Sequence, residues 1–342
     1  MWGVASLVFC LFSILPGDPS RMMLGQRDNE EMRLVIQKKY GFDKPVATQY
    51  CYFINDLSPL SLHGNNSDDF TNLSNHPYSV AATFSFDACS IVLKAPYLRE
   101  SFVRKGVSVS SIIANTLPNT FILAITAMFI AMVLGISLGV FSAVHQHKFI
   151  DQFLSSIAVF GMALPSFFSA ILIAWVFGFI YQEYTGLSMT GSLYEVDDYG
   201  SGESLVLKNL ILPAITLGIR PLAVVMQLTR NSILDTLGED YIRTAKAKGL
   251  SSFRVLFVHA LPNALNPVVT SASGWLASML AGAVFVEFIF GWNGLGKEIV
   301  YALNYLDLPV VMGAVLTLSI CFVIITIFTD LLYYLLDPKI RV

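Results

Sequence analysis

Residues Gly291-Trp-Asn-Gly-Leu-Gly-Lys297 have the G-x-x-x-x-G-K spacing of a phosphate-binding loop, the most direct sign of chemistry in this sequence. In such a loop the backbone N–H groups and the lysine bind phosphates, and a following Ser or Thr binds magnesium. Glu298 stands at that Ser or Thr position here, and its charge would repel a phosphate. A long apolar run, rather than a strand, precedes the segment. We therefore expect no nucleotide to bind to this chain.

The histidines bear on a second possible chemistry, hydrolysis inside a membrane. Such an enzyme needs a catalytic base or a cluster of metal ligands within its apolar runs. The sequence contains no H-E-x-x-H pattern, and its five histidines fall outside the long apolar runs: His63, His76, His145, His147 and His259. We therefore expect no catalytic residue, no metal and no cofactor.

The four cysteines lack the spacing of metal ligands. Cys10 and Cys321 lie in apolar runs, where we expect them to be packing residues. Cys51 and Cys89 share one hydrophilic segment, so a disulfide between them is open if that segment faces an oxidising compartment. Spacing alone does not decide whether these two residues meet.

Three charged residues lie within or at the ends of long apolar runs: Arg220, Glu287 and Asp330. A charge at the centre of a bilayer costs about 2.5–3.5 kcal/mol on insertion scales, so each should face the interior of a helix bundle or a membrane surface. For Glu287, a place on a polar pore between the helices and pairing between helices both stay open, and the pore is our working prediction. For Arg220 and Asp330 we predict pairing, or contact of Asp330 with the cytoplasmic surface.

The stretch from 237 to 262 is the most polar part of the second half, although long apolar runs flank it on both sides. Its first part is predicted to be a short helix, because acids begin it and Lys248 lies near its end, as the helix dipole favours. Gly249 then suits a left-handed stop. Tyr241, Ala245 and Lys248 recur on one stripe of this helix, where the small Ala245 would let a partner protein approach closely.

A second short helix is predicted after the glycine, capped by Ser251 or Ser252 and ended by Pro262. Its predicted apolar face has helical spacing and consists of Phe253, Leu256, Phe257, Ala260 and Leu261. Two helices joined at a glycine would form an ordered protrusion to which another protein could bind.

The chain that must position these residues is strongly apolar, with 342 residues of which 55% are hydrophobic and 13% are charged. Soluble domains have about 45–50% apolar and about 25% charged residues, so we expect an integral membrane protein. The net charge of −3 does not indicate a nucleic-acid partner. Six spans are predicted, all helical: 2–15, 120–144, 152–182, 210–229, 266–290 and 308–336. The first covers only about 21 Å of a hydrocarbon core of about 30 Å, so we expect its basic N-terminal part to be missing.

Loop charge predicts the orientation of the spans. The loop from Glu183 to Lys208 has five acids and one base, whereas the stretch from Arg230 to Leu265 has five bases and three acids. The second loop is therefore predicted to be cytoplasmic, with both termini on the same side. Residues 16–115 are then extracytoplasmic, with predicted helices that are capped by Asp28, closed by Gly41 and restarted at Pro45.

Within the polar stretch, Arg243-Thr-Ala245, Gly249, His259 and Leu261-Pro262 have the spacing of the EAA motif of permeases of ATP-binding-cassette (ABC) importers. Arg243 and Thr244 depart from the Glu and Ala of that motif, and both departures resemble its di- and oligopeptide branch. Further similar segments are Leu15–Pro19, Leu210–Gly218, Leu228–Leu234, His259–Leu265, Gly291–Lys297 and Asp337–Arg341. The sequence thus resembles a permease subunit of the bacterial dipeptide, oligopeptide and nickel importer family.

The resemblance implies an all-α integral membrane protein with the type I importer permease fold. Residues 1–15 would be the first helix, 16–115 an extracytoplasmic segment with an insertion at about 64–98, and 116–342 the permease domain. The cytoplasmic loop 232–265 would couple to ATPase subunits, through Tyr241, Arg243, Thr244, Ala245, Lys248, Gly249, Leu261 and Pro262.

The implied assembly lies in the bacterial inner membrane and has four kinds of partner. They are a second homologous permease, two ATPase subunits, an extracytoplasmic substrate-binding protein and the lipid bilayer. The implied activity is ATP-driven import of peptides by alternating access. Nickel or glutathione import remains open within the family, and a passive channel is the alternative of a different class.

Overall fold

A computed structural model describes residues 2–14, 20, 24, 29–65, 69–73, 78–86, 89–196 and 202–336. Asp28, His76, the 15–19 motif and the tail after 336 lie outside these described residues. The chain divides into two compact units, one formed by 1–116 with 298–320 and one formed by 117–297 with 321–342. Each unit is described by itself below.

The first unit is built on helix α1 (Trp2–Ile14), which packs against α4 (Val46–Leu57). Ala5 and Phe53 are buried together with Leu316, which belongs to α15 (Leu308–Leu336). The rings of Phe9 and Phe53 stack at 5.5 Å between centroids, and the hydroxyl groups of Ser6 and Tyr50 are hydrogen-bonded at 2.6 Å. The unit also holds α3 (Glu30–Tyr40), the start of α5 (Val109–Val144) and most of α14 (Leu295–Asn304).

Helix α3 begins one residue later than its capping pattern predicted. Asn29 is the N-cap, and its side chain accepts a hydrogen bond from the N–H of Glu31. The prediction of Asp28 as the cap was wrong, because Asn29 supplies the same kind of acceptor next to the first turn. Gly41 ends the helix with a φ of +71°, as its position predicted.

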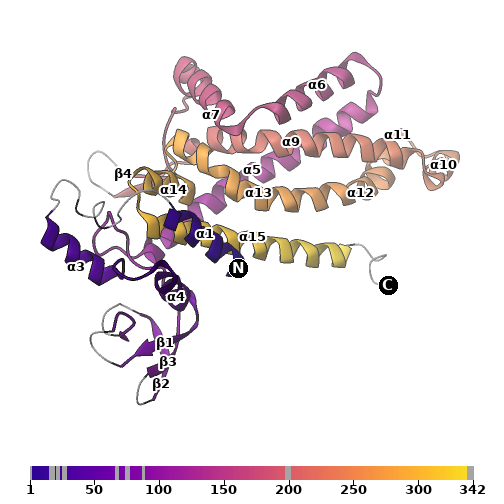
Figure 1. The fold of residues 1–342 in the computed structure, drawn as a ribbon. Helices are drawn as coiled ribbons and strands as arrows, with labels where there is room; N and C mark the ends of the chain where they lie inside the picture. Colours follow the sequence, from indigo (N-terminus) through magenta and orange to yellow (C-terminus); the bar gives the residue numbers. More distant parts are fainter. Residues whose placement is uncertain are drawn as a thin grey trace. The chain divides into compact units, whose positions relative to one another are not determined.

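A three-stranded antiparallel sheet follows α4, in the order β1 (Leu60–Gly64), β3 (Cys89–Lys94), β2 (Val80–Ser85). The prediction of an all-α fold was therefore wrong for this segment (Figure 1). Side chains along β1 and β3 alternate between exposed and buried, which is the period of a strand.

Polar side chains hold the sheet to α4. The Asp56 carboxylate accepts hydrogen bonds from the Tyr78 hydroxyl and from Arg99 Nε, each at 2.9 Å. Lys94 Nζ donates to the backbone oxygen of Asp56 at 2.8 Å. His63 bonds to the Thr71 carbonyl through Nδ1 at 2.6 Å and to the Ser61 hydroxyl through Nε2 at 2.8 Å. Burial with partners makes this polar side of the sheet its inner side.

The second unit consists mainly of helices that are long and apolar. It contains the rest of α5, together with α6 (Phe149–Ala163), α7 (Ser166–Trp175), a π-helix (Val176–Ile180), α8 (Gln182–Thr185), β4 (Tyr194–Val196), β5 (Glu203–Leu205), α9 (Lys208–Leu237) and α13 (Asn266–Phe290). Helix α9 packs against α6, α7 and α13, and Figure 1 shows α9 and α13 running side by side. Gly135 and Gly139 of α5 approach α9 so closely that a Cβ on Gly139 would lie 2.6 Å from the Met226 carbonyl oxygen. Small residues at such a contact let helices in a membrane pack backbone to backbone.

Among the described residues, four helices are long and apolar enough to cross a membrane: α5, α9, α13 and α15. The single span predicted over 152–182 is instead α6 and α7, which meet at an angle of 108° and count as a fifth span only if taken together. Pro165 lies at that break, where it lacks an N–H to continue the helix. Helix α1 is apolar but shorter, so the prediction of six spans is not confirmed.

The cysteines differ from two expectations. Cys10 is exposed rather than packed, although Cys321 is half-buried. Cys51 and Cys89 are both free and exposed, so this structure contains no disulfide between them.

The buried His63 predicts how the sheet responds to pH. Burial lowers the pKa of His63 below its usual 6.5, and the nearby Lys94 charge acts in the same direction, against the Thr71 hydrogen bond and Asp56. The unfolded segment then binds a proton at higher pH than the folded one, so the sheet should lose stability as the pH falls below 6.5. Hydrogen-exchange protection of β1 and β3, corrected for intrinsic rates, should be lower at about pH 5 than at about pH 7.5. His63→Gln should remove most of this difference, and an unchanged difference would contradict the assignment.

Candidate functional site

The polar stretch after α9 folds as two short helical parts joined at a glycine. Helix α10 (Asp240–Ala247) comes first, and Gly249 follows with a φ of +77°, as predicted. Ser251 then caps α11 (Ser252–Arg254) by accepting a hydrogen bond from the N–H of Arg254. These elements, with the π-helix (Val255–Ala260) and α12 (Leu261–Ala264) that continue them, are called the two-helix loop below.

The two-helix loop has a hydrophobic core of its own. Ile242 and Ala245 of α10 are buried against Val255 and Ala260 of the second part. Ala245 is 7% exposed, so a partner protein cannot contact its side chain. The predicted role of Ala245 as an open contact on the stripe is therefore wrong: its small size serves packing between the two halves of the loop.

The second part of the loop differs from its predicted apolar face. Residues Val255 to Ala260 form a π-helix, which turns the helix surface so that Val255 and Ala260 point inward. Phe253, a member of the predicted apolar face, is 72% exposed, and the centroid of its ring lies 4.5 Å from that of the exposed Phe257. Pro262 does not end the helix but lies in the first turn of α12. Its missing N–H is tolerated there, directly after the wider π-helical turn.

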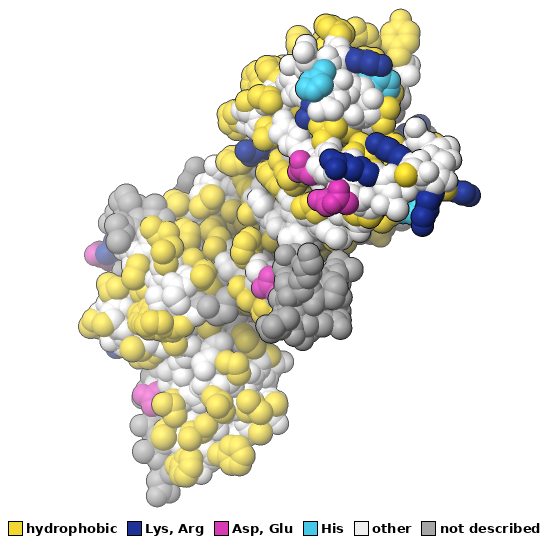
Figure 2. All heavy atoms as spheres, turned by 90° about the vertical axis from the view of Figure 1, so that its right-hand side faces the viewer, with side chains coloured by type: hydrophobic (Ala, Val, Ile, Leu, Met, Phe, Trp, Pro, Cys, Tyr) yellow, Lys and Arg dark blue, Asp and Glu magenta, His cyan; other side chains and the backbone are white. Residues whose placement is uncertain are grey.

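The outer surface of α10 is polar. Tyr241, Arg243, Thr244 and Lys248 are all exposed, and Arg243 forms a surface ion pair with Asp240 at 3.3 Å. The Tyr241 hydroxyl accepts a hydrogen bond from Asn263 Nδ2 at 2.9 Å, which ties the two halves of the loop together. Figure 2 shows Lys and Arg side chains gathered in the upper part of this view. The exposed residues thus offer a partly cationic surface on a rigid base.

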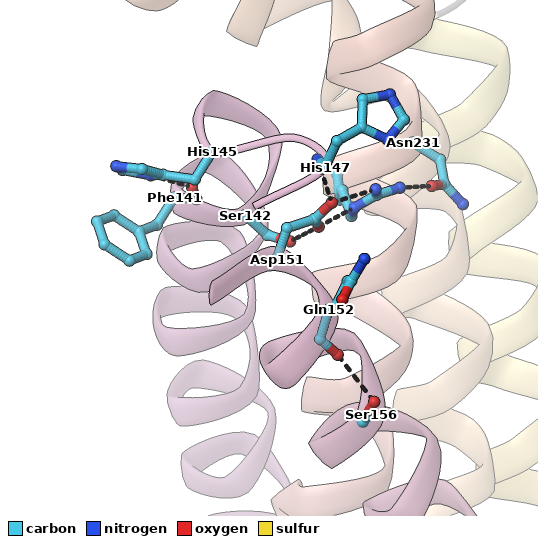
Figure 3. A network of polar contacts seen from close by, with 9 residues as sticks. Phe141, Ser142, His145, His147, Asp151, Gln152, Ser156 and Asn231 are labelled. Carbon is cyan, nitrogen blue, oxygen red and sulfur yellow. Dashed lines mark hydrogen bonds and ion pairs between the residues drawn. The ribbon is translucent and has the colours of Figure 1, made fainter. Parts of the chain in front are cut away.

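A buried ion pair lies at the base of the loop, and sequence reasoning missed it. Asp151, in the first turn of α6, is 3% exposed and accepts hydrogen bonds from Arg230 Nη2 at 2.7 Å and Nε at 2.5 Å. It also accepts from the Ser142 hydroxyl at 2.6 Å and from the N–H of His147 at 3.1 Å (Figure 3). An acid at a helix start and an arginine near a helix end were the only sequence signals.

This network joins three elements at one carboxylate. Ser142 belongs to the end of α5, His147 to the turn before α6, and Arg230 to α9. Helix α9 continues to Leu237 and then leads directly into α10. The buried pair therefore connects α5 and α6 to α9, the helix that leads into the two-helix loop.

Glu287 does not lie on a surface of the described chain. It is fully buried, and its Oε2 accepts hydrogen bonds from the N–H groups of Gly296 at 2.7 Å and Lys297 at 3.2 Å. A Cβ on Gly294 would lie 2.3 Å from the Glu287 carboxylate, so the glycine makes room for the acid. These contacts favour a structural role for Glu287 over a place on the translocation path.

The same contacts explain the phosphate-loop pattern at 291–297. The N–H groups at the start of α14, where a phosphate would bind, are occupied by Glu287 of the chain itself. Lys297 Nζ donates to the Gly291 carbonyl at 3.0 Å and to Asn293 Oδ1 at 2.8 Å, so it too is engaged in the turn. The other two charges in apolar runs, Arg220 and Asp330, are exposed rather than enclosed between helices.

The bundle of apolar helices with an ordered polar loop has the fold of ABC transporter membrane subunits. A chain of the inward-facing MetNI methionine ABC transporter superposes with a TM-score of 0.52, at 16% sequence identity, over 67% of this chain and 97% of that chain. A chain of an amino acid ABC transporter with histidines superposes with a TM-score of 0.50, at 15% identity, over 66% and 95% of the two chains.

Sequence comparison defines the family more closely. Residues 135–342 match the family described as "Binding-protein-dependent transport system inner membrane component", and residues 1–66 match its N-terminal counterpart. The dipeptide transport system permease protein DppB of Escherichia coli K12 is 32% identical over 99% of this chain and 94% of its own length. DppB of Bacillus subtilis is 30% identical over 99% and 92%. The di/tripeptide permease DppB of Pseudomonas aeruginosa is 32% identical over 99% and 94%.

The chain belongs to this family of inner membrane components of binding-protein-dependent transport systems. It is a multi-pass membrane permease subunit of an ABC importer and not an enzyme. The family implies that an ATPase and a substrate-binding protein are its partners.

Removing the buried charge of Asp151 should destabilise the permease. Asp151→Asn leaves Arg230 without its counter-ion in a largely buried site, where breaking such a pair costs about 3 kcal/mol. The midpoint of thermal unfolding in detergent should fall clearly. The matched control is Asp240→Asn, which breaks the exposed pair with Arg243 and should leave the midpoint unchanged. Equal midpoints for the two variants would show that the buried pair does not support the fold.

Glu287→Gln separates a structural role from a role in the translocation path. A neutral amide is a weaker acceptor for the two N–H groups at the start of α14, so unfolding should become easier by about 1–3 kcal/mol. Transport per folded transporter should stay close to that of the unmodified protein. Both quantities can be measured on one preparation, by thermal unfolding and by uptake into proteoliposomes. Normal stability with abolished uptake would instead place Glu287 on the path.

Proposed function

We propose that this chain is the permease subunit of an importer for dipeptides and oligopeptides. The observation that carries this proposal is its similarity to dipeptide permeases over 99% of its length. The helices would form the translocation path by alternating access, and ATP would be hydrolysed by separate subunits.

The proposed assembly has a second homologous permease and two ATPase subunits, with an extracytoplasmic binding protein that delivers the peptide. We infer from loop charge that the two-helix loop and both termini are cytoplasmic, and that residues 16–115 face the other side. The cationic surface around α10 supports this orientation, because basic residues are enriched in cytoplasmic loops.

We propose that the ATPase subunit binds the two-helix loop through the exposed side of α10. Tyr241, Arg243, Thr244 and Lys248 would contact the ATPase, because their side chains are accessible. The remaining residues assigned to coupling would shape the loop instead: Ala245 packs its core, Gly249 makes its turn, and Leu261 with Pro262 begins α12. The Asp151–Arg230 pair would then transmit the movement of the loop to α5 and α6.

A charge reversal on the exposed side of α10 tests this assignment. Lys248→Glu should leave the fold intact, because the side chain is exposed, but should repel an ATPase surface that complements a cation. The ATPase should co-purify less and peptide uptake should fall at least tenfold. Lys148→Glu is the matched control, since this exposed lysine lies in the α5–α6 turn, outside the two-helix loop. If Lys248→Glu retains both the ATPase and uptake, α10 is not the docking surface.

A further inference from the structure

The three-stranded sheet of the first unit has its apolar side outward. Along β1 and β3 the exposed positions are Leu60, Leu62, Ile91 and Leu93, and Phe84 of β2 pairs with Ile91 on the same side. Leu60, Leu62 and Phe84 are 66%, 60% and 65% exposed. Because Leu60 pairs with Leu93 and Leu62 with Ile91, these side chains form one continuous patch, called the outer sheet face below. A sheet with one side in water normally shows the reverse pattern.

The inward side of the sheet is specified by polar contacts, so the outer sheet face is not the result of an undecided register. Ser61, His63, Ser90 and Lys94 are all buried on the inward side. His63 and Lys94 have the partners described above, and the Ser90 hydroxyl donates to Asn65 Oδ1 at 2.7 Å. A shift of the strand register by one residue would turn these polar side chains to the outer side and break their hydrogen bonds. The sequence therefore places the apolar side chains outward.

The attachment of the sheet to α4 places it near the apolar helices. Asn55 of α4 donates to the Leu62 carbonyl at 2.9 Å and accepts from the Leu62 N–H at 2.8 Å, so β1 is held directly to the helix end. Phe53, two residues earlier, is buried with Ala5 of α1 and Leu316 of α15. Leu316 lies about 12 Å along α15 from its first residue at a rise of about 1.5 Å per residue, inside a helix long enough to cross the membrane. Helix α4, which holds the start of the sheet, thus packs against two apolar helices of the same unit.

We propose that the outer sheet face lies on the phospholipid bilayer and buries its apolar side chains at the boundary of headgroups and acyl chains. Five large apolar side chains without a charged neighbour among them suit lipid, since a contiguous exposed apolar patch marks a membrane or protein contact. Lipid is favoured here because α4 packs against α1, an apolar helix that leaves Leu7 and Leu11 exposed, and against α15, which is long enough to cross a membrane. The sheet acts as a second membrane anchor beside the spans.

Spin labels on the sheet test this contact in the assembled transporter, reconstituted into phosphatidylcholine–phosphatidylglycerol vesicles. The native Cys89 lies on the outer side of β3, and Cys10, Cys51 and Cys321 would be replaced by Ser. Relaxation by oxygen, which concentrates in lipid, should exceed relaxation by a water-soluble nickel chelate at least threefold. A label at Phe84→Cys, in a variant without native cysteines, should behave in the same way.

The matched control is Thr83→Cys, because Thr83 is exposed on the same strand but pairs with Val92 of the inward side. Its label should be more accessible to the nickel chelate than to oxygen. The proposal is overturned if Cys89 and Phe84→Cys labels resemble this control, because the face would then lie in water. It is equally overturned if both labels are shielded from oxygen and nickel alike, because a protein surface would then cover the sheet.

Discussion

The arrangement of the second unit depends on one buried carboxylate. Asp151 receives hydrogen bonds from Arg230, from Ser142 and from the backbone of His147, so a single group joins α5, α6 and α9. A charge without partners would be costly in such a site, and the geometry of the three helix ends is therefore tightly constrained. At the start of α14, two backbone N–H groups likewise bond to Oε2 of the buried Glu287 and complete a turn whose sequence resembles a nucleotide site.

A loop with its own core suits the transfer of movement between subunits. Because Ile242 and Ala245 pack against Val255, α10 cannot shift without the second part of the loop. Its polar side is exposed, as the proposed contact with an ATPase requires, and α10 follows directly after α9. In the proposed coupling, the loop would move as one body, and α9 with the pair of Arg230 and Asp151 would connect it to the remaining helices.

The sheet of the first unit applies the usual rule of burial in reverse. Apart from Val92, its enclosed side chains are polar and have partners such as Asp56, and five large apolar side chains face outward, as expected for a surface whose surroundings are lipid. In water the exposed Leu62 and Phe84 would be unfavourable, whereas contact with a bilayer removes them from water. Removal of apolar side chains from water and hydrogen bonding of enclosed polar groups thus account both for the helices and for this small β segment.

The sequence by itself determined the family, the apolar helices α5, α9, α13 and α15, and the left-handed turn at Gly249, because motif spacing, apolar runs and glycine conformation are local properties. Only the tertiary structure decided that Ala245 is buried, since its neighbours come from the second half of the loop. Arg230 meets Asp151 across 79 positions of the chain, a pairing that no local pattern encodes. The outward side of the sheet was likewise decided by polar partners on α4, because alternation shows that a strand has two sides but not which one is enclosed.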